Sequence, residues 1–159
     1  DRAMLDVLLG NLDAEAREAR PAPQAGALRQ TIDEALAGAD GDYTGAIQGV
    51  RKLRGHGGWI DRAVDTMEAG CPVTAGIVVE QLRRAKDLAL ADRFRMEMVV
   101  GTHCARNRDF AEGVRALLID KDRSPQWSVD GLDALSPKTV QAHFEPPWEE
   151  NPLADLRDP

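Results

Sequence analysis

The chain has 159 residues, a net charge of −7, 43% hydrophobic residues and only 4% aromatic residues. This length is enough for one domain with a hydrophobic core. The acidic balance argues against a nucleic-acid-binding protein, which needs a basic face. The lack of an apolar run approaching about 20 residues argues against a membrane-spanning helix.

The composition favours an all-α fold. Ala, Leu, Arg and Glu, which are good helix formers, are abundant, and alternating runs of β-branched and aromatic residues are scarce. The two cysteines, Cys71 and Cys104, do not require a disulfide, so a reducing compartment is the simpler expectation. The chain starts at Asp1 and shows no signal peptide. We therefore expect either a processed chain or a piece of a longer protein.

The first 69 residues are predicted to be a helical lead-in segment. Apolar residues recur at helical spacing, Pro21 interrupts the first run, and Gly38 is a natural stop for the second. Residues 38–58 are rich in glycine and are predicted to form a loop. We expect helices over residues 1–20, 25–37 and 59–69.

Two features of the glycine-rich loop require a choice between alternatives. The spacing of Asp40, Asp42 and Thr44 imitates the start of a calcium-binding EF-hand loop. Arg51 stands where the bidentate Glu is needed, so we predict a polar turn before a helix and no metal site. The basic stretch from Arg51 to Gly58 is predicted to be a solvated, flexible loop, with phosphate contact as the alternative.

The second half of the chain is predicted to be helical as well. Pro72 suits the first turn of a helix, and residues 88–106 form a long amphipathic segment. Ser136 and Pro137 predict a short helix that ends near residue 144, and residues 146–159 form a tail that packs on a neighbour or stays loose. The apolar faces are expected to comprise Ile77, Val78, Leu82 and Ala85 in the first helix and Leu90, Phe94, Met98 and Ala105 in the second.

The stretch from Asp109 to Trp127 organises the chain. Its sequence predicts a short helix that Asp109 caps, with Glu112 completing a capping box. Pro125 ends the helix, and Trp127 folds back onto its apolar face. That face is expected to comprise Phe110, Val114, Leu117 and Leu118.

The pattern Asp-Phe-x-Glu-Gly-Val-Arg-Ala-x-Leu-Ile-Asp-Lys-Asp-x-x-Pro-x-Trp in this stretch resembles the C-terminal signature of a known family. The family is the enoyl-CoA hydratase/isomerase (crotonase) superfamily, and the Leu-Ile-Asp-Lys-Asp form is similar to its 3-hydroxyisobutyryl-CoA hydrolase branch. The resemblance covers about residues 70–145. Cys71-Pro-Val-Thr resembles the family's Ser-Pro-Thr-Ser, whereas Gly76 replaces a family Lys and Met98 a family Tyr.

The resemblance implies that this chain is the C-terminal helical region of an acyl-CoA enzyme, and that the catalytic ββα core, with its oxyanion-hole amides, is absent from the chain. The expected organisation is a lead-in segment over 1–69, a family-like region over 70–145 and a tail over 146–159. The expected role is to pack on the core and close the acyl-CoA site of a CoA-thioester hydrolase in valine catabolism. The partners would be the N-terminal crotonase core and acyl-CoA, with homo-oligomerisation left open. The location would be cytoplasmic, or mitochondrial in a eukaryote.

Two alternatives to this function remain. One is the C-terminal domain of an enoyl-CoA hydratase/isomerase, and the other is a stand-alone helical module that binds a protein partner through an apolar surface.

No independent catalytic or metal site is predicted, and the chain alone is expected to be inactive. His103 and Cys104 are adjacent and diverge on a helix, and the cysteines and histidines lack zinc-site spacing. A salt bridge and a helix cap explain Glu97 and Glu112 better than acid–base catalysis does. Lys121 and Arg123 are the only candidate cofactor-binding residues. The resemblance implies CoA contact there, and helix-end stabilisation is the alternative.

Overall fold

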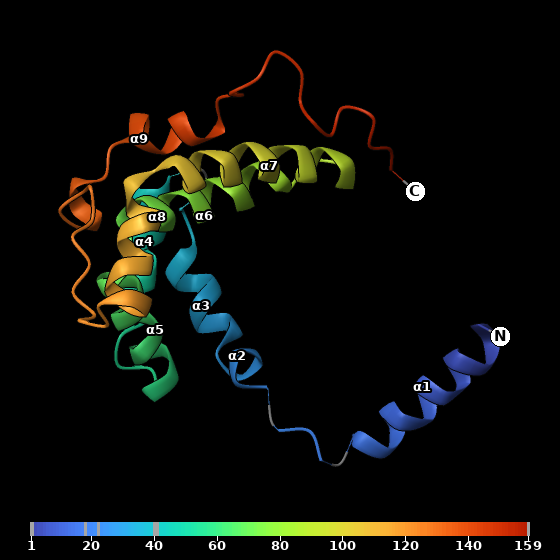
Figure 1. The fold of residues 1–159 in the computed structure, drawn as a ribbon. Helices are drawn as coiled ribbons and strands as arrows, with labels where there is room; N and C mark the ends of the chain where they lie inside the picture. The colour runs from blue at the N-terminus through green and yellow to red at the C-terminus, as the bar shows by residue number, and fades with distance from the viewer. Residues whose placement is uncertain (1, 18, 22, 40–41, 159) are drawn as a thin grey trace. The chain divides into compact units, whose positions relative to one another are not determined.

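The computed structural model describes residues 2–17, 19–21, 23–39 and 42–158, and every regular element in these ranges is helical, which confirms the all-α prediction. No helix in this part of the chain combines the length and hydropathy needed to cross a membrane. The α-helices are α1 (Arg2–Ala16), α2 (Gln24–Ala27), α3 (Arg29–Leu36), α4 (Tyr43–Lys52), α5 (Gly58–Ala69), α6 (Pro72–Ala85), α7 (Leu90–Arg106), α8 (Arg108–Val114) and α9 (Pro137–Gln141) (Figure 1). The short elements are a π-helical turn η1 (Arg115–Ile119) and two 3₁₀ turns, η2 (Leu132–Ala134) and η3 (Ala142–Phe144).

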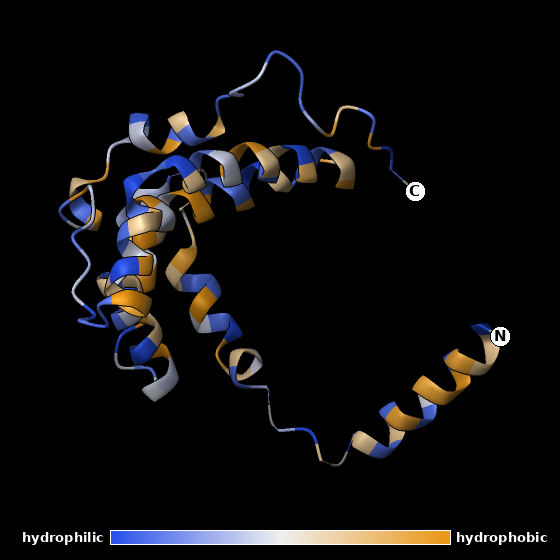
Figure 2. Ribbon diagram, in the orientation of Figure 1, coloured by the Kyte–Doolittle hydropathy of each residue, from blue (hydrophilic) through white to orange (hydrophobic). Residues whose placement is uncertain are grey.

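The chain forms two compact units, one up to Thr31 and one from Ile32 onward. The first unit contains α1, a helix in which apolar residues outnumber hydrophilic ones (Figure 2). Within this unit its apolar side chains stay exposed. The single helix predicted over 25–37 is instead two helices, α2 and α3, separated at Leu28.

The glycine-rich segment contains a helix, so the prediction of a loop over 38–58 is wrong. Asp42 caps α4, because its carboxylate accepts a hydrogen bond from the Thr44 amide at 2.9 Å. A side chain at Gly49 would collide with the Ala35 carbonyl, so glycine here permits close packing rather than a turn. Asp40 of the calcium-like pattern lies outside the described residues. Asp42 of the pattern directly precedes α4, and the rest of the described pattern, Tyr43 to Ile47, lies within that helix.

The prediction that residues 51–58 form a flexible loop is wrong at Arg51. Arg51 is not part of a flexible loop. It lies in the last turn of α4, and it pairs with Glu68 of α5 at 2.6 Å and with Asp133 of η2 at 2.7 Å. These two carboxylates occupy the guanidinium, so Arg51 joins three elements and is not available as a phosphate ligand.

Helix α6 lies at the centre of the second unit, where it contacts α4, α5, η2 and α9 (Figure 1). Its buried face follows the spacing i, i+3, i+4 and i+7 from Val73 through Gly76 and Ile77 to Glu80. The predicted face is therefore only partly right, because Val78 and Leu82 are exposed. The main core cluster comprises Val73, Ile77, Val100, Leu135, Val140 and Phe144.

Gly76 is a point of close approach between the central helix and the C-terminal segment. A Cβ atom there would lie 2.6 Å from Cγ2 of Val140 and 2.7 Å from Cδ2 of Leu135. Such distances are far inside van der Waals contact, so only glycine fits without a shift of the core. The residue that replaces the family's Lys thus has a packing role of its own.

Helix α7 supports the C-terminal residues. It buries Ala91, Val99 and Val100, whereas the apolar stripe predicted as its inner face is exposed at Leu90, Phe94 and Met98.

The tail lies on α7. The Arg95 side chain donates to the Leu153 carbonyl at 3.0 Å, and the amide of Ala91 donates to Asp158 at 2.9 Å. The short helix predicted from Ser136 and Pro137 is confirmed as α9, and the Ser136 hydroxyl accepts from the Thr139 amide.

Candidate functional site

The signature stretch forms a bent element made of α8 and η1. Its cap differs from the prediction, because Asn107 accepts the hydrogen bond from the amide of Asp109 at 3.0 Å. The predicted capping box is therefore wrong. Asp109 is buried, and its carboxylate accepts from the amide and the hydroxyl of Ser128, each at 2.7 Å. The Cys71 thiol approaches the same carboxylate at 3.5 Å. This carboxylate joins α8 to the start of α6 and to the segment after Trp127.

Trp127 folds back onto α8, as predicted. Its ring lies against Gly113, where a Cβ atom would be 3.4 Å from the ring edge, and its indole N–H donates to the Ala69 carbonyl at 3.4 Å. The predicted apolar face of the signature helix lines a hollow of about 360 Å³ beside this ring. The lining residues are Cys71, Val73, Thr74, Ile77, Cys104, Asn107, Asp109, Phe110, Gly113, Val114, Leu117, Leu118, Trp127 and His143.

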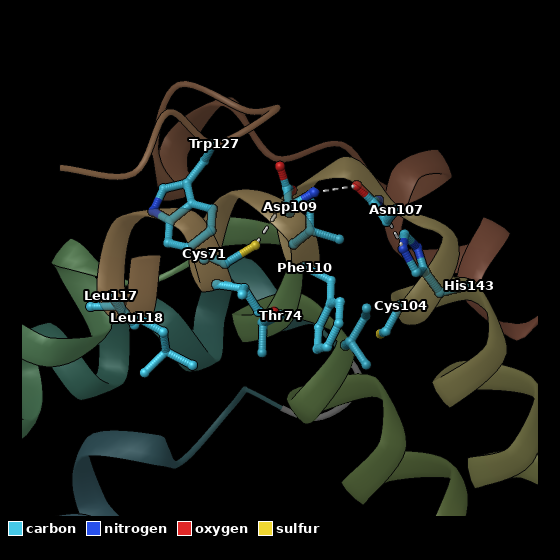
Figure 3. A pocket seen from close by; sticks show the side chains of 14 residues that line it. Cys71, Thr74, Cys104, Asn107, Asp109, Phe110, Leu117, Leu118, Trp127 and His143 are labelled. Atoms are coloured by element: carbon cyan, nitrogen blue, oxygen red, sulfur yellow. Dashed lines mark hydrogen bonds between the residues drawn. The ribbon is translucent and has the colours of Figure 1, made fainter. Parts of the chain in front are cut away.

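The hollow has one apolar end and one polar end (Figure 3). Trp127, Leu117 and Leu118 lie at the apolar end, whereas Asn107 and His143 lie at the other (Figure 3). The Nδ1 atom of His143 lies 2.9 Å from the Thr139 carbonyl and therefore donates to it. Its Nε2 atom then accepts from the Asn107 side-chain amide at 3.3 Å. The side chains of Asn107 and His143 thus have hydrogen-bond partners within the chain, and among the described residues they supply no free nucleophile–base pair.

The two cysteines both line this hollow as free thiols. Burial raises the pKa of the Cys104 thiol, which favours its protonated form. No cluster of three or more metal-ligating side chains occurs in the described residues. Of the adjacent pair His103 and Cys104, Cys104 lines the hollow and His103 does not, which fits the predicted divergence. The Nε2 atom of His103 lies 2.7 Å from the Glu145 carbonyl instead.

The carboxylates considered for acid–base chemistry do not line the hollow. Glu97 is exposed on α7. Glu112 pairs with the Arg115 guanidinium at 2.7 Å and accepts from the Gln126 amide at 2.7 Å. The pairing with Arg115, with the help of that amide, lowers the pKa of Glu112 to about 2. Glu112 therefore forms a salt bridge in place of the helix cap that the sequence predicted.

Lys121 and Arg123 lie in the turn that follows η1, where both are exposed and both have positive φ, 58° and 55°. Neither side chain lies in the lining of the hollow. These two cations therefore follow the signature helix and are not among the residues that line the hollow.

Sequence reasoning missed the polar end of the hollow. Asn107 and His143 are 36 positions apart and come together only because α9 and η3 pack on α6 and α7. The one available signal was Asn107 itself, since Asn directly before a helical run is a common cap.

The large exposed apolar side chains of the second unit are confined to three elements, α6, α7 and α8–η1. Leu117, Leu118 and Ile119 are 57%, 68% and 69% exposed. Large exposed apolar side chains gathered on a few elements can form a binding surface. The full set comprises Val78, Leu82, Leu90, Phe94, Met98, Phe110, Leu117, Leu118 and Ile119, and we call it the apolar face.

A family model described as Enoyl-CoA hydratase/isomerase matches residues 1–144. The chain belongs to the enoyl-CoA hydratase/isomerase family. This match confirms the superfamily to which the signature pointed and extends the likeness upstream of residue 70, where the sequence resemblance ended.

Curated relatives of this family member carry the name 3-hydroxyisobutyryl-CoA hydrolase. The chicken (Gallus gallus) mitochondrial protein is 36% identical over 98 residues, which is 61% of this chain and 26% of the relative. The Dictyostelium discoideum mitochondrial protein is 34% identical over 89 residues, 55% of this chain and 23% of the relative. The matched part is thus about a quarter of the length of these relatives.

The fold is also similar to that of a solved member of the family. An enoyl-CoA hydratase from Rhodobacter sphaeroides 2.4.1 superposes with a TM-score of 0.67 at 24% sequence identity. The superposition covers 92% of this chain and 43% of that chain. The helical arrangement described above is therefore one that a crotonase-type protein contains.

Proposed function

We propose that this chain is the helical C-terminal portion of an acyl-CoA enzyme similar to 3-hydroxyisobutyryl-CoA hydrolase, and that it packs on a catalytic crotonase core and closes the acyl-CoA site. The observation that carries the proposal is the apolar face together with the hollow beside Trp127. The stretch that resembles the family signature contributes residues to both, and the curated relatives that match this chain bear the hydrolase name.

The physical argument starts from the cost of exposed apolar surface. Removing apolar area from water stabilises by about 25 cal/mol per Å², so the apolar face provides a driving force for docking. A crotonase core would cover it, with the acyl group in contact with the hollow at the junction. The thioester would be hydrolysed through an oxyanion held by backbone amides of that core, and this chain would exclude water and complete the wall of the site.

Several finer points belong to the same proposal. The reaction would serve valine catabolism. Lys121 and Arg123 would contact the phosphates of CoA. The location would be mitochondrial in a eukaryotic host, in line with the names of the relatives, and cytoplasmic otherwise. Association into a homo-oligomer would use the part of the apolar face that the core leaves uncovered.

The test is thiol release from 3-hydroxyisobutyryl-CoA, measured for the chain alone, a separately produced crotonase core alone, and the two mixed. We expect the chain alone to match the no-protein background and the mixture to exceed the core alone. Turnover by the isolated chain would refute the proposal. Substituting Leu117 and Leu118 with Ser should abolish the gain, whereas Lys138→Ser on the exposed side of α9 should preserve it.

Hydratase or isomerase chemistry is the second candidate, favoured by the description of the family model. The same mixture assayed with an enoyl-CoA and with 3-hydroxyisobutyryl-CoA separates the two. Water addition without thiol release would favour the hydratase.

A further inference from the structure

The turn after the signature helix is organised around one guanidinium. Arg115 donates to Glu112 at 2.7 and 2.9 Å, to Asp120 at 2.7 Å and to Asp122 at 2.6 Å. It also donates to the Ser124 carbonyl at 3.2 Å. Three carboxylates and one carbonyl therefore converge on a single cation, and we call these groups the Arg115 clasp.

The backbone of the same turn closes on α8 and η1. The amide of Arg123 donates to the Ala116 carbonyl at 3.0 Å, and the amide of Ser124 donates to Asp122 at 2.9 Å. Glu112 accepts from the Gln126 amide at 2.7 Å. The clasp thus fixes the course of the chain from Asp120 to Gln126.

Along this turn, the acidic and basic residues alternate. Asp120 and Asp122 direct their carboxylates to Arg115, whereas Lys121, which lies between them, and Arg123, which follows, are exposed and are not part of the clasp. Both basic residues adopt the left-handed backbone conformation, with φ of 58° and 55°, which side chains other than glycine adopt only at a cost. Backbone strain of this kind persists only where the surroundings impose it, and it gathers at functional sites.

The charges of this segment are unevenly distributed. The clasp holds three carboxylates against one guanidinium, so it is net negative. Lys121 and Arg123 are exposed cations two positions apart, a span of at most about 7 Å along the backbone. Two cations at that separation suit a ligand with phosphate groups, because charge-assisted hydrogen bonds to phosphate are strong.

We propose that Arg115 is a positioning residue whose clasp holds Lys121 and Arg123 in the orientation that binds the phosphates of the CoA nucleotide. This inference rests on the proposed function, and it adds a role for residues that do not touch the ligand. Arg115, Asp120 and Asp122 act through the geometry of the turn, and Lys121 and Arg123 make the contact.

The test measures CoA binding by calorimetry, with adenosine 3′,5′-bisphosphate as a second probe for the nucleotide end alone. Replacing both Lys121 and Arg123 with Ala should weaken both ligands about 10-fold or more, because two charge-assisted contacts are lost. Arg115→Gln should weaken the binding of both ligands to a similar extent, although Arg115 itself contacts neither ligand. Arg106→Gln, which removes one exposed cation from the end of α7, should leave both affinities unchanged.

Combining Arg115→Gln with the double Ala variant should weaken binding no further than the double variant alone, since the two changes act through one contact. NMR shifts and couplings at positions 121 and 123 should report positive φ in the wild type and its loss in Arg115→Gln. Asp122→Asn and Arg115→Lys, which leave part of the clasp, should fall between. These two variants also test the positioning role if Arg115→Gln does not fold.

The outcomes separate the two ideas. If the wild-type chain binds neither probe, or the double Ala variant binds as well as the wild type, the CoA contact and this inference both fall. If the double variant weakens binding while the Arg115 variants lose positive φ and still bind normally, the contact stands and the positioning role is refuted.

Discussion

Glu80 offers the sharpest test of the energetics, because it is a nearly buried carboxylate on the central helix. It is 5% exposed, and its carboxylate accepts two hydrogen bonds from Arg83, at 2.6 and 2.8 Å, and one from Arg84 at 2.6 Å. The Arg84 guanidinium also lies 4.2 Å above the Phe144 ring. The perturbation we choose is Glu80→Gln, which keeps the shape and removes the charge.

The magnitude follows from the pKa of Glu80. Pairing with Arg83, and further hydrogen bonds from Arg84 and Gln141, outweigh burial and lower that pKa from 4.5 to about 2. The difference corresponds to about 3 kcal/mol of stability at neutral pH. The Arg83 side chain is 47% exposed, so solvent weakens its share. We therefore expect Glu80→Gln to lower the free energy of unfolding by about 2 kcal/mol at pH 7.

The pH dependence has a definite sign. Because the pKa of Glu80 is lower in the folded state, its stabilisation is complete above about pH 4.5 and is lost as the pH falls toward 2. The difference between wild type and Glu80→Gln should therefore shrink over this range. Urea unfolding followed by circular dichroism, repeated from pH 7 downward, measures it.

The control for this experiment is Glu97→Gln, on the exposed side of α7, which should change stability by less than about 0.5 kcal/mol. A Glu80→Gln protein as stable as the wild type at pH 7 would contradict the reasoning. So would a difference that stays constant between pH 4.5 and the acid limit of folding.

Three further predictions concern the packing at Gly76, the hydrogen bonds of Asp109 and the apolar face. Gly76→Ala should destabilise by about 1–3 kcal/mol, because the new methyl collides with Val140 and Leu135. Gly101→Ala, on α7 with open space around it, should stabilise by up to about 1 kcal/mol through helix propensity. Thermal denaturation compares the two, and equal effects would refute the packing role of Gly76. Asp109→Asn should cost about 1–3 kcal/mol, because one acceptor of the Ser128 amide and hydroxyl is replaced by a donor. Trp127 fluorescence should then shift toward that of a solvated indole, and an unchanged spectrum would argue against the link. Leu118→Ser should leave the unfolding free energy within about 0.5 kcal/mol, since this side chain is 68% exposed. It should also reduce self-association in sedimentation experiments, and unchanged association would mean that the apolar face does not attract a partner.

Local sequence signals account for much of the helical content. Pro72 and the Ser136-Pro137 pair mark helix starts that the structure contains at the predicted positions. These signals work because a cap or a fixed φ acts within one turn of the chain. The return of Trp127 onto the signature helix was also predictable, since an apolar side chain just past a helix end has the apolar face of that helix within reach.

The glycines show where local reasoning fails. Gly49 lies inside a helix that sequence analysis assigned to a loop, and Gly76 lies on the buried side of another helix. Propensity penalises glycine in both places by about 1 kcal/mol. Glycine stands at both positions despite this cost because a second backbone or side chain occupies the space that a Cβ atom would need. That neighbour is remote in the sequence.

The sequence by itself determined that this protein is helical and where most of its helices begin and end, because periodicity and capping are local properties. The superfamily was indicated by the resemblance of residues 109–127 to a known signature. Only the tertiary structure decided which faces are buried. Helices α6 and α7 each carry more apolar residues than one core can cover, so periodicity identifies the stripes without saying which is inside. The Asn107–His143 pair and the partners of Arg51 likewise depend on segments that meet only after packing.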